Sequence, residues 1–259
     1  MTVFDRFQTY GYIHHRALNR RAALAIAQKA VAEFPGVTHV FEGDVCWHFA
    51  GGRSDLYFRH PLLFFDSLSA EAIDARRPIR VEDLPALVPK GVFLAIELKI
   101  GRGPWREAVA RLLKLLDRDF AGRYWIDGFS LNLMRHVKAM RPDLTVTLHT
   151  EHVSGGKALV VSPDSPWPRR MPLAEIPLDG VSVRWHGTTG MVARGAADVR
   201  KADKTLLISR IHNLEQYRQS RLWGAVAGYI HGDFAALMRF EEATFGHAAN
   251  AIENHAMAE

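Results

Sequence analysis

The stretch that decides the fold is Phe93-Leu94-Ala95-Ile96-Glu97-Leu98-Lys99. An apolar run of strand character meets a glutamate, and a lysine follows two residues later. Because alternate side chains of a strand point to the same side, Glu97 and Lys99 are expected to share one face. An apolar strand that ends in titratable side chains is typical of a parallel sheet with a functional site at its carboxyl edge.

Two upstream segments show the same design. Val40-Phe41-Glu42-Gly43-Asp44 passes from an apolar run into a Glu-x-Asp pair, and Tyr12-Ile13-His14-His15-Arg16 closes on histidine and arginine. Three early strands with titratable ends predict a (β/α)8 TIM barrel whose active site lies at the carboxyl ends of the strands.

The rest of the chain alternates in the way that such a barrel requires. Its 259 residues match the roughly 250 of a (β/α)8 barrel, so we expect one catalytic domain over residues 1–259. Gly-Gly and five prolines between residues 155 and 177 predict an irregular loop insertion near the barrel mouth. The expected strands lie near residues 10–14, 37–42, 92–98, 123–128, 144–149, 180–184, 205–209 and 226–230.

Expected helices lie between these strands. Trp105 to Leu116 repeats apolar residues at helical spacing and follows Pro104, which suits a helix start. Asn132 to Met140 follows Ser130, a good capping residue. A further helical pattern runs from Phe234 to Ala243.

Composition excludes several classes of protein. The single cysteine, Cys46, excludes an internal disulfide and a cysteine zinc cluster. No apolar run approaches the ~20 residues of a membrane span, and the first residues show no signal segment, so we expect a cytoplasmic protein without stable membrane insertion. The mild net charge of +5 suits a small anionic substrate and makes no continuous basic stripe for nucleic acid.

The order of the polar motifs resembles that of the glycerophosphodiester phosphodiesterase family. The chain presents His15-Arg16, then Glu42-x-Asp44, then His60, then Glu97-x-Lys99. The resemblance covers nearly the whole chain, and it implies a TIM barrel that hydrolyses a glycerophosphodiester in lipid metabolism. The chain departs from the family pattern where Ala17 follows His-Arg and where Pro61 follows His60. It also lacks the family's Glu-Asn-Thr sequence and has Ile208-Ser209 in place of its late tryptophan-threonine pair. Asn19 is similar to a feature of the related sphingomyelinase D branch.

The carboxylates also predict a metal site by their chemistry. A phosphodiester carries a negative charge, which a divalent cation neutralises while it polarises the phosphoryl oxygens. Mg²⁺ and Ca²⁺ prefer oxygen ligands. Glu42, Asp44 and Glu97 stand at the ends of two main strands, so we predict that they bind one Mg²⁺ or Ca²⁺ ion.

Basic side chains complete the predicted site. His15 and His60 are candidates for proton transfer, because the ordinary pKa of histidine lies near neutrality. His14 competes with His15, since the pleat of this strand is not fixed by the sequence. Arg16 and Lys99 are candidates for binding phosphate oxygens, the first as a fork of donors and the second as a point charge.

Three functions are compatible with this pattern. The favoured one is a metal-dependent phosphodiesterase that hydrolyses a glycerophosphodiester or a similar small phosphodiester. The second is a phospholipase D-like or sugar-phosphodiester lyase that forms a cyclic phosphate. The third is a barrel without enzymatic activity that binds phosphorylated ligands. Product analysis separates the first two, and cation-dependent turnover separates both from the third.

Overall fold

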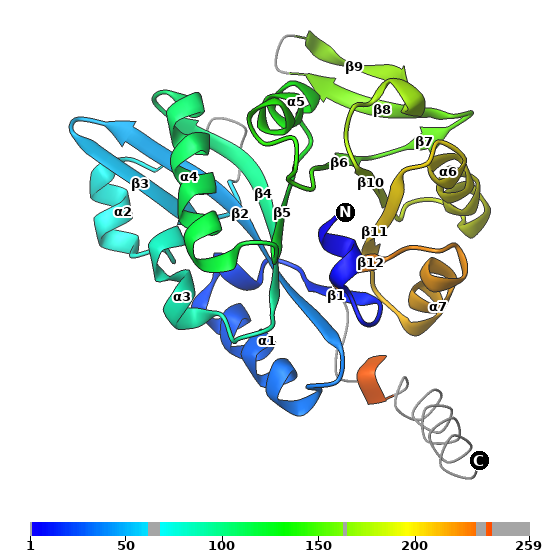
Figure 1. Ribbon diagram of the computed structural model, residues 1–259, viewed down its shortest axis with the longest axis horizontal. Helices are drawn as coiled ribbons and strands as arrows, with labels where there is room; N and C mark the ends of the chain where they lie inside the picture. Colours follow the sequence, from blue (N-terminus) through cyan, green and yellow to red (C-terminus); the bar gives the residue numbers. More distant parts are fainter. Residues whose placement is uncertain (1, 62–67, 163–164, 232–236, 240–259) are drawn as a thin grey trace.

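A barrel of parallel strands forms the centre of the computed structural model, which describes residues 2–61, 68–162, 165–231 and 237–239 (Figure 1). In the described part of the chain, eight parallel strands lie in the order β5-β4-β2-β1-β12-β11-β10-β6, and a bridge between Ile126 and Val146 joins β5 to β6. All eight expected strands are present, so the predicted (β/α)8 barrel is confirmed. The strands are β1 (Gly11–His14), β2 (Thr38–Ala50), β4 (Phe93–Arg102), β5 (Tyr124–Asp127), β6 (Thr147–Thr150), β10 (Gly180–Arg184), β11 (Thr205–Ile211) and β12 (Ala227–Ile230).

Helices surround the barrel. Ser130 caps α5 as predicted, because its hydroxyl accepts a hydrogen bond from the Leu133 backbone N–H. The helix expected over 234–243 lies outside the described residues except for 237–239. The helices between strands are α1 (Arg21–Glu33), α2 (Ala70–Arg76), α3 (Leu84–Leu87), α4 (Trp105–Phe120), α5 (Leu131–Met140), α6 (Thr189–Lys201) and α7 (Leu214–Leu222).

The strand pleat divides the apolar side chains into two layers. Outward residues such as Phe41 and Leu94 pack in the large core between the strands and the helices. Inward residues such as Ile13, Val40 and Ala95 form a second, smaller core inside the barrel. The same alternation carries the polar residues that follow Val40 and Ala95 on β2 and β4 toward the barrel axis.

The first residues close the amino-terminal end of the barrel. A 3₁₀ turn, η1 (Val3–Arg6), lies within the ring of strands in Figure 1. The Phe4 ring meets Trp125 of β5 edge-on at 5.2 Å, and the Val3 backbone N–H donates to the Thr145 hydroxyl at 2.8 Å. Apolar packing therefore fills this end and leaves the carboxyl ends of the strands for polar side chains.

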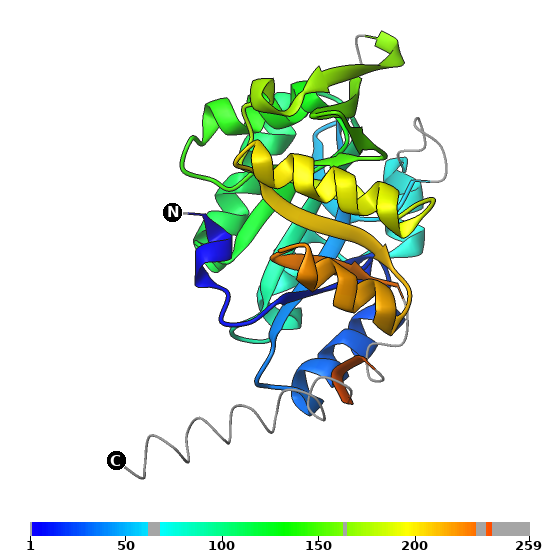
Figure 2. The same cartoon turned by 90° about the vertical axis from the view of Figure 1, so that its right-hand side faces the viewer.

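Two excursions depart from the simple barrel. β3 (Arg53–Phe58) pairs antiparallel with the end of β2, through a turn at Gly51-Gly52 where both φ angles are positive, 60° and 77°. β7 (Val153–Ser154), β8 (Lys157–Ser162) and β9 (Ser165–Pro172) form an antiparallel sheet beside α5 and α6 (Figures 1 and 2).

The insertion near 155–177 was therefore predicted in the right place, but its description as an irregular loop was wrong. Its strand β9 lies at the edge of the β7–β9 sheet. An edge strand can accept proline because one side of its backbone has no strand to bond.

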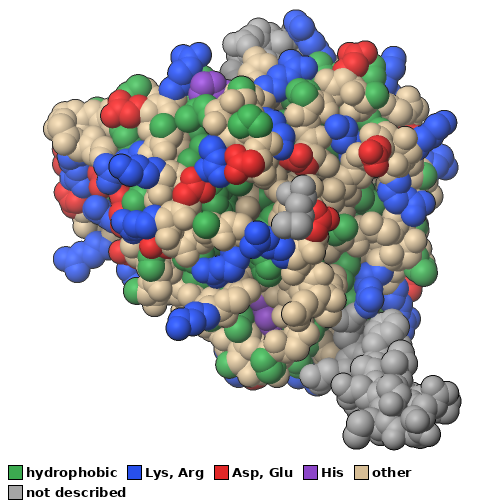
Figure 3. All heavy atoms as spheres, viewed as in Figure 1, with side chains coloured by type: hydrophobic (Ala, Val, Ile, Leu, Met, Phe, Trp, Pro, Cys, Tyr) green, Lys and Arg blue, Asp and Glu red, His purple; other side chains and the backbone are tan. Residues whose placement is uncertain are grey.

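The described surface is mixed in charge. Lys, Arg, Asp and Glu side chains are interspersed over the face seen in Figure 3. No helix among the described residues combines the length and the apolar character that crossing a membrane requires.

Candidate active site

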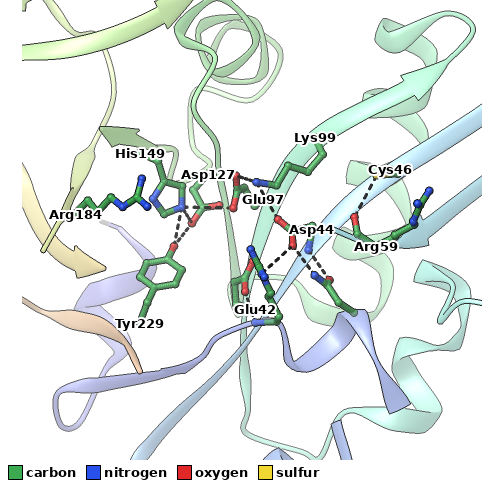
Figure 4. A network of polar contacts seen from close by, with 12 residues as sticks. Glu42, Asp44, Cys46, Arg59, Glu97, Lys99, Asp127, His149, Arg184 and Tyr229 are labelled. Atoms are coloured by element: carbon green, nitrogen blue, oxygen red, sulfur yellow. Dashed lines mark hydrogen bonds and ion pairs between the residues drawn. The ribbon is translucent and has the colours of Figure 1, made fainter. Parts of the chain in front are cut away.

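Three buried carboxylates meet on β2 and β4, at the level where the neighbouring strands β1 and β5 end. Glu42, Asp44 and Glu97 are 0%, 1% and 6% exposed, and one oxygen from each lies within 4.8 Å of the other two. Asp44 pairs in register with Glu97, and Glu42 stands two residues before Asp44 on the same face of β2. The structure thus brings together the three residues that the sequence proposed as metal ligands (Figure 4).

The turn after β1 holds two of these carboxylates in place. Arg16 has a left-handed backbone (φ 59°), and its N–H donates to Glu42 Oε2. Asn19, in the short turn η2 (Ala17–Asn19), donates from Nδ2 to Asp44 Oδ2 and accepts from the Asp44 backbone N–H at 2.9 Å. Sequence reasoning noticed Asn19 only as a resemblance, whereas the structure shows it orienting a carboxylate.

Lys99 lies against the same group of carboxylates. Its Nζ is 3.0 Å from Asp44 Oδ1 and donates to Glu97 Oε1. Burial alone would lower the pKa of Lys99, but the Glu97 and Asp44 carboxylates raise it above its ordinary value. Lys99 therefore stays charged and offsets part of the negative charge.

The remaining negative charge makes the group suitable for a cation. Burial, with the nearby Asp44 carboxylate, raises the pKa of Glu42 well above its ordinary value, and burial raises that of Glu97 to about 7. Glu42 Oε1 is buried and has no hydrogen-bond partner among the described residues. An all-oxygen set with an unpaired buried oxygen fits the ligand preference of Mg²⁺ or Ca²⁺.

The pleat of β1 separates the two adjacent histidines. His14 points away from the barrel axis, where its ring stacks on His39 and its Nε2 lies 3.0 Å from His39 Nδ1. His15 lies on the other face, with its ring 3.9 Å from that of His231. Burial, followed by the neighbouring His231, lowers the pKa of His15 to about 2. His15 is therefore neutral near neutral pH.

The other two predicted residues lie at the barrel mouth. Arg16 is exposed, and its Nε is 3.9 Å from Asp44 Oδ2. His60 is also exposed and follows β3. The backbone N–H of Arg59 donates to the Asp44 carbonyl at 2.8 Å and so fixes this segment beside the carboxylates. Partial burial lowers the pKa of His60, and the Asp44 carboxylate acts in the opposite direction.

Sequence reasoning missed a second polar group. Tyr229 on β12 donates its hydroxyl to Asp127 Oδ2 on β5, and His149 Nε2 on β6 lies 3.2 Å from the same oxygen. His149 Nε2 is also 4.0 Å from Glu97 Oε2, so the two groups are continuous (Figure 4). Asp127 carried the same signal as Glu97, a carboxylate at the end of an apolar run.

Comparison with known proteins shows a shared fold. No protein-family model matches the chain, and a sequence search found no match among curated proteins. A phosphodiesterase from Oleispira antarctica, solved with its product sn-glycerol-3-phosphate, is similar with a TM-score of 0.65 and 14% identity over 89% of this chain and 95% of that one. A glycerophosphodiester phosphodiesterase from Parabacteroides distasonis gives 0.60 and 14% over 86% and 93%, and one from Thermotoga maritima gives 0.56 and 13% over 86% and 94%.

Proposed function

We propose that this chain is a cation-dependent phosphodiesterase that hydrolyses a glycerophosphodiester or a similar small phosphodiester. The observation that carries the proposal is the convergence of Glu42, Asp44 and Glu97, all buried, around Lys99 at the carboxyl end of the barrel. Similarity to solved glycerophosphodiester phosphodiesterases supports it at the level of fold.

The three carboxylates are the proposed ligands of one Mg²⁺ or Ca²⁺ ion. When bound, the cation neutralises the phosphodiester charge and polarises its phosphoryl oxygens. Asn19 and the Arg16 backbone N–H hold Asp44 and Glu42 in a fixed orientation, so little rearrangement is needed.

Arg16 and Lys99 are the proposed contacts to the phosphate oxygens. The exposed Arg16 guanidinium can offer two parallel donors from the mouth. Lys99 presents a charged Nζ from the floor of the site, where it already contacts Asp44 and Glu97. Together they would orient the phosphodiester above the carboxylates.

His15 and His60 are the proposed proton carriers. His15 stays neutral and lies on the face of β1 opposite to His14, and this form and position suit a base that removes a proton from the attacking water. His60, at the rim, would then donate a proton to the leaving alcohol oxygen as the phosphorus–oxygen ester bond breaks. Water supplies the new phosphorus–oxygen bond, so the products are an alcohol and a phosphate monoester.

A substrate screen tests this proposal. The purified chain is incubated with a panel of glycerophosphodiesters, lysophospholipids and sugar phosphodiesters, with Mg²⁺ or Ca²⁺ and with a chelator. We expect turnover only when a cation is present. Replacing His60 with alanine should lower turnover roughly 10²–10⁴-fold, whereas His136→Ala on the outer helix α5 should not. Failure of every substrate with both cations would reject the proposal.

A further inference from the structure

We propose that Glu97, Asp127 and His149 form a second divalent-cation site, which shares Glu97 with the first. The three side chains come from the adjacent strands β4, β5 and β6 and are 6%, 0% and 6% exposed. Glu97 and Asp127 pair directly in register, and the His149 backbone N–H donates to the Gly128 carbonyl at 2.9 Å. The inference concerns binding alone, so it can hold or fail independently of the proposed reaction.

The spacing of the ligand atoms suits a metal ion. His149 Nε2 is 3.2 Å from Asp127 Oδ2 and 4.0 Å from Glu97 Oε2, and one ligand atom from each residue lies within 4.8 Å of the other two. With metal–ligand bonds of about 2.1 Å, neighbouring ligands of an octahedral ion lie about 3.0 Å apart and opposite ones about 4.2 Å apart. The two separations from His149 Nε2, 3.2 and 4.0 Å, fall within this range.

Unpaired polar atoms around His149 give an independent reason to expect a polar ligand. Asp127 Oδ1, Thr147 Oγ1 and Ser182 Oγ are buried and have no hydrogen-bond partner among the described residues. Thr147 precedes His149 by two residues on the same face of β6, and Ser182 of β10 pairs with His149 in register. Since buried polar atoms almost always have partners, these three indicate an ion with its bound water.

The ligand atoms indicate which cation the second site prefers. Its mixed set of one imidazole nitrogen and two carboxylates suits Zn²⁺ through the nitrogen and Mn²⁺ through the oxygens, whereas the all-oxygen set of Glu42, Asp44 and Glu97 favours Mg²⁺ or Ca²⁺. The Tyr229 hydroxyl donates to Asp127 Oδ2 and so fixes the carboxylate beside His149. Hydrogen bonds of this kind commonly orient metal ligands.

Calorimetric titration of the full, metal-free chain with Mn²⁺ tests the inference. We expect two equivalents in the unaltered protein and one in Asp127→Asn and in His149→Gln. Tyr229→Phe is the matched control, because it removes the hydroxyl contacts to Asp127 Oδ2 and His149 Nε2 but no ligand, and it should keep both equivalents. Circular dichroism of each variant checks that the barrel is folded.

Electron paramagnetic resonance adds a readout that is specific for the shared ligand. Two Mn²⁺ ions joined through the Glu97 carboxylate should give an exchange-coupled spectrum, which Asp127→Asn converts to that of an isolated ion. A single equivalent in the unaltered protein would overturn the inference. A second equivalent that persists in both folded variants, Asp127→Asn and His149→Gln, would overturn it as well.

Discussion

Replacing Glu42 with glutamine should stabilise the metal-free protein and abolish its response to Mg²⁺ or Ca²⁺. Glu42 is fully buried, and its Oε1 has no hydrogen-bond partner among the described residues. The glutamine carbonyl can still accept the hydrogen bond that the Arg16 N–H donates to Oε2 of Glu42 in the unaltered protein. Its amide group offers donors to the neighbouring carboxylates of Asp44 and Glu97. The change therefore removes a buried charge and preserves the shape.

The expected gain follows from the cost of that charge. An unpaired buried polar group costs about 1–3 kcal/mol, and a buried charge costs more. The raised pKa of Glu42 relieves part of this cost, because the carboxylate can take up a proton. We therefore expect a gain of about 1–3 kcal/mol in the free energy of unfolding. For a chain of this size, that gain corresponds to a rise of about 2–12 °C in melting temperature.

Thermal unfolding followed by circular dichroism measures this effect, first with a chelator and then with Mg²⁺ or Ca²⁺. A cation at a hundred times its dissociation constant should stabilise the unaltered protein by about 2.7 kcal/mol and leave Glu42→Gln nearly unchanged. Glu175→Gln, an exposed carboxylate, is the matched control and should shift neither curve appreciably. A lower melting temperature for Glu42→Gln in chelator, or an equal cation effect in both proteins, would refute the reasoning.

Other expected outcomes concern the histidines, Lys99 and pH. His15→Ala should lower turnover roughly 10²–10⁴-fold with the fold intact, whereas His14→Ala should lower it much less. Steady-state kinetics that give the reverse order would show that His14, and not His15, acts in the site. Excess cation should partly restore the activity of Glu97→Gln but not of Lys99→Ala, and identical metal titrations would contradict this division of roles. Burial lowers the pKa of His14 from 6.5 to about 3, so the unfolded chain binds a proton that the folded chain does not. The stability contributed by neutral His14 should be complete above about pH 6.5 and fall by about 2 kcal/mol at pH 5. In denaturant titrations, the free energy of unfolding of His14→Asn should fall less steeply with decreasing pH than that of the unaltered protein. An unchanged pH dependence would contradict this role of His14.

The barrel strands were predictable because burial on both faces gives continuous apolar runs. The carboxyl-terminal boundaries of β2 and β4 were not predictable. β2 continues to Ala50 and β4 to Arg102, since the two strands pair beyond the barrel at Trp47 and Gly101 and β3 adds a partner for β2. These pairings join segments far apart in the sequence. β9 was not predicted because its prolines are typical of loops, and the sequence does not show that the strand lies at the edge of its sheet.

Part of the candidate site was predictable for the same local reason. Glu42 and Asp44 share a strand face through the period of two, and Glu97 forms the last pair of β4 with β5. The grouping of Asp127 with His149 was not predictable. Their contact depends on β6 lying beside β5, where the chain forms a bridge between Ile126 and Val146 and a hydrogen bond from the His149 N–H to the Gly128 carbonyl.

Phosphorus-31 nuclear magnetic resonance of a glycerophosphodiester incubated with the protein is the most direct test of the central claim. With Mg²⁺ or Ca²⁺, we predict that the diester signal is replaced by that of a phosphate monoester. With a chelator, or with Glu42→Gln in place of the unaltered chain, the diester signal should persist. Conversion that proceeds equally well in chelator, or a cyclic phosphate as the final product, would contradict cation-dependent hydrolysis at this site.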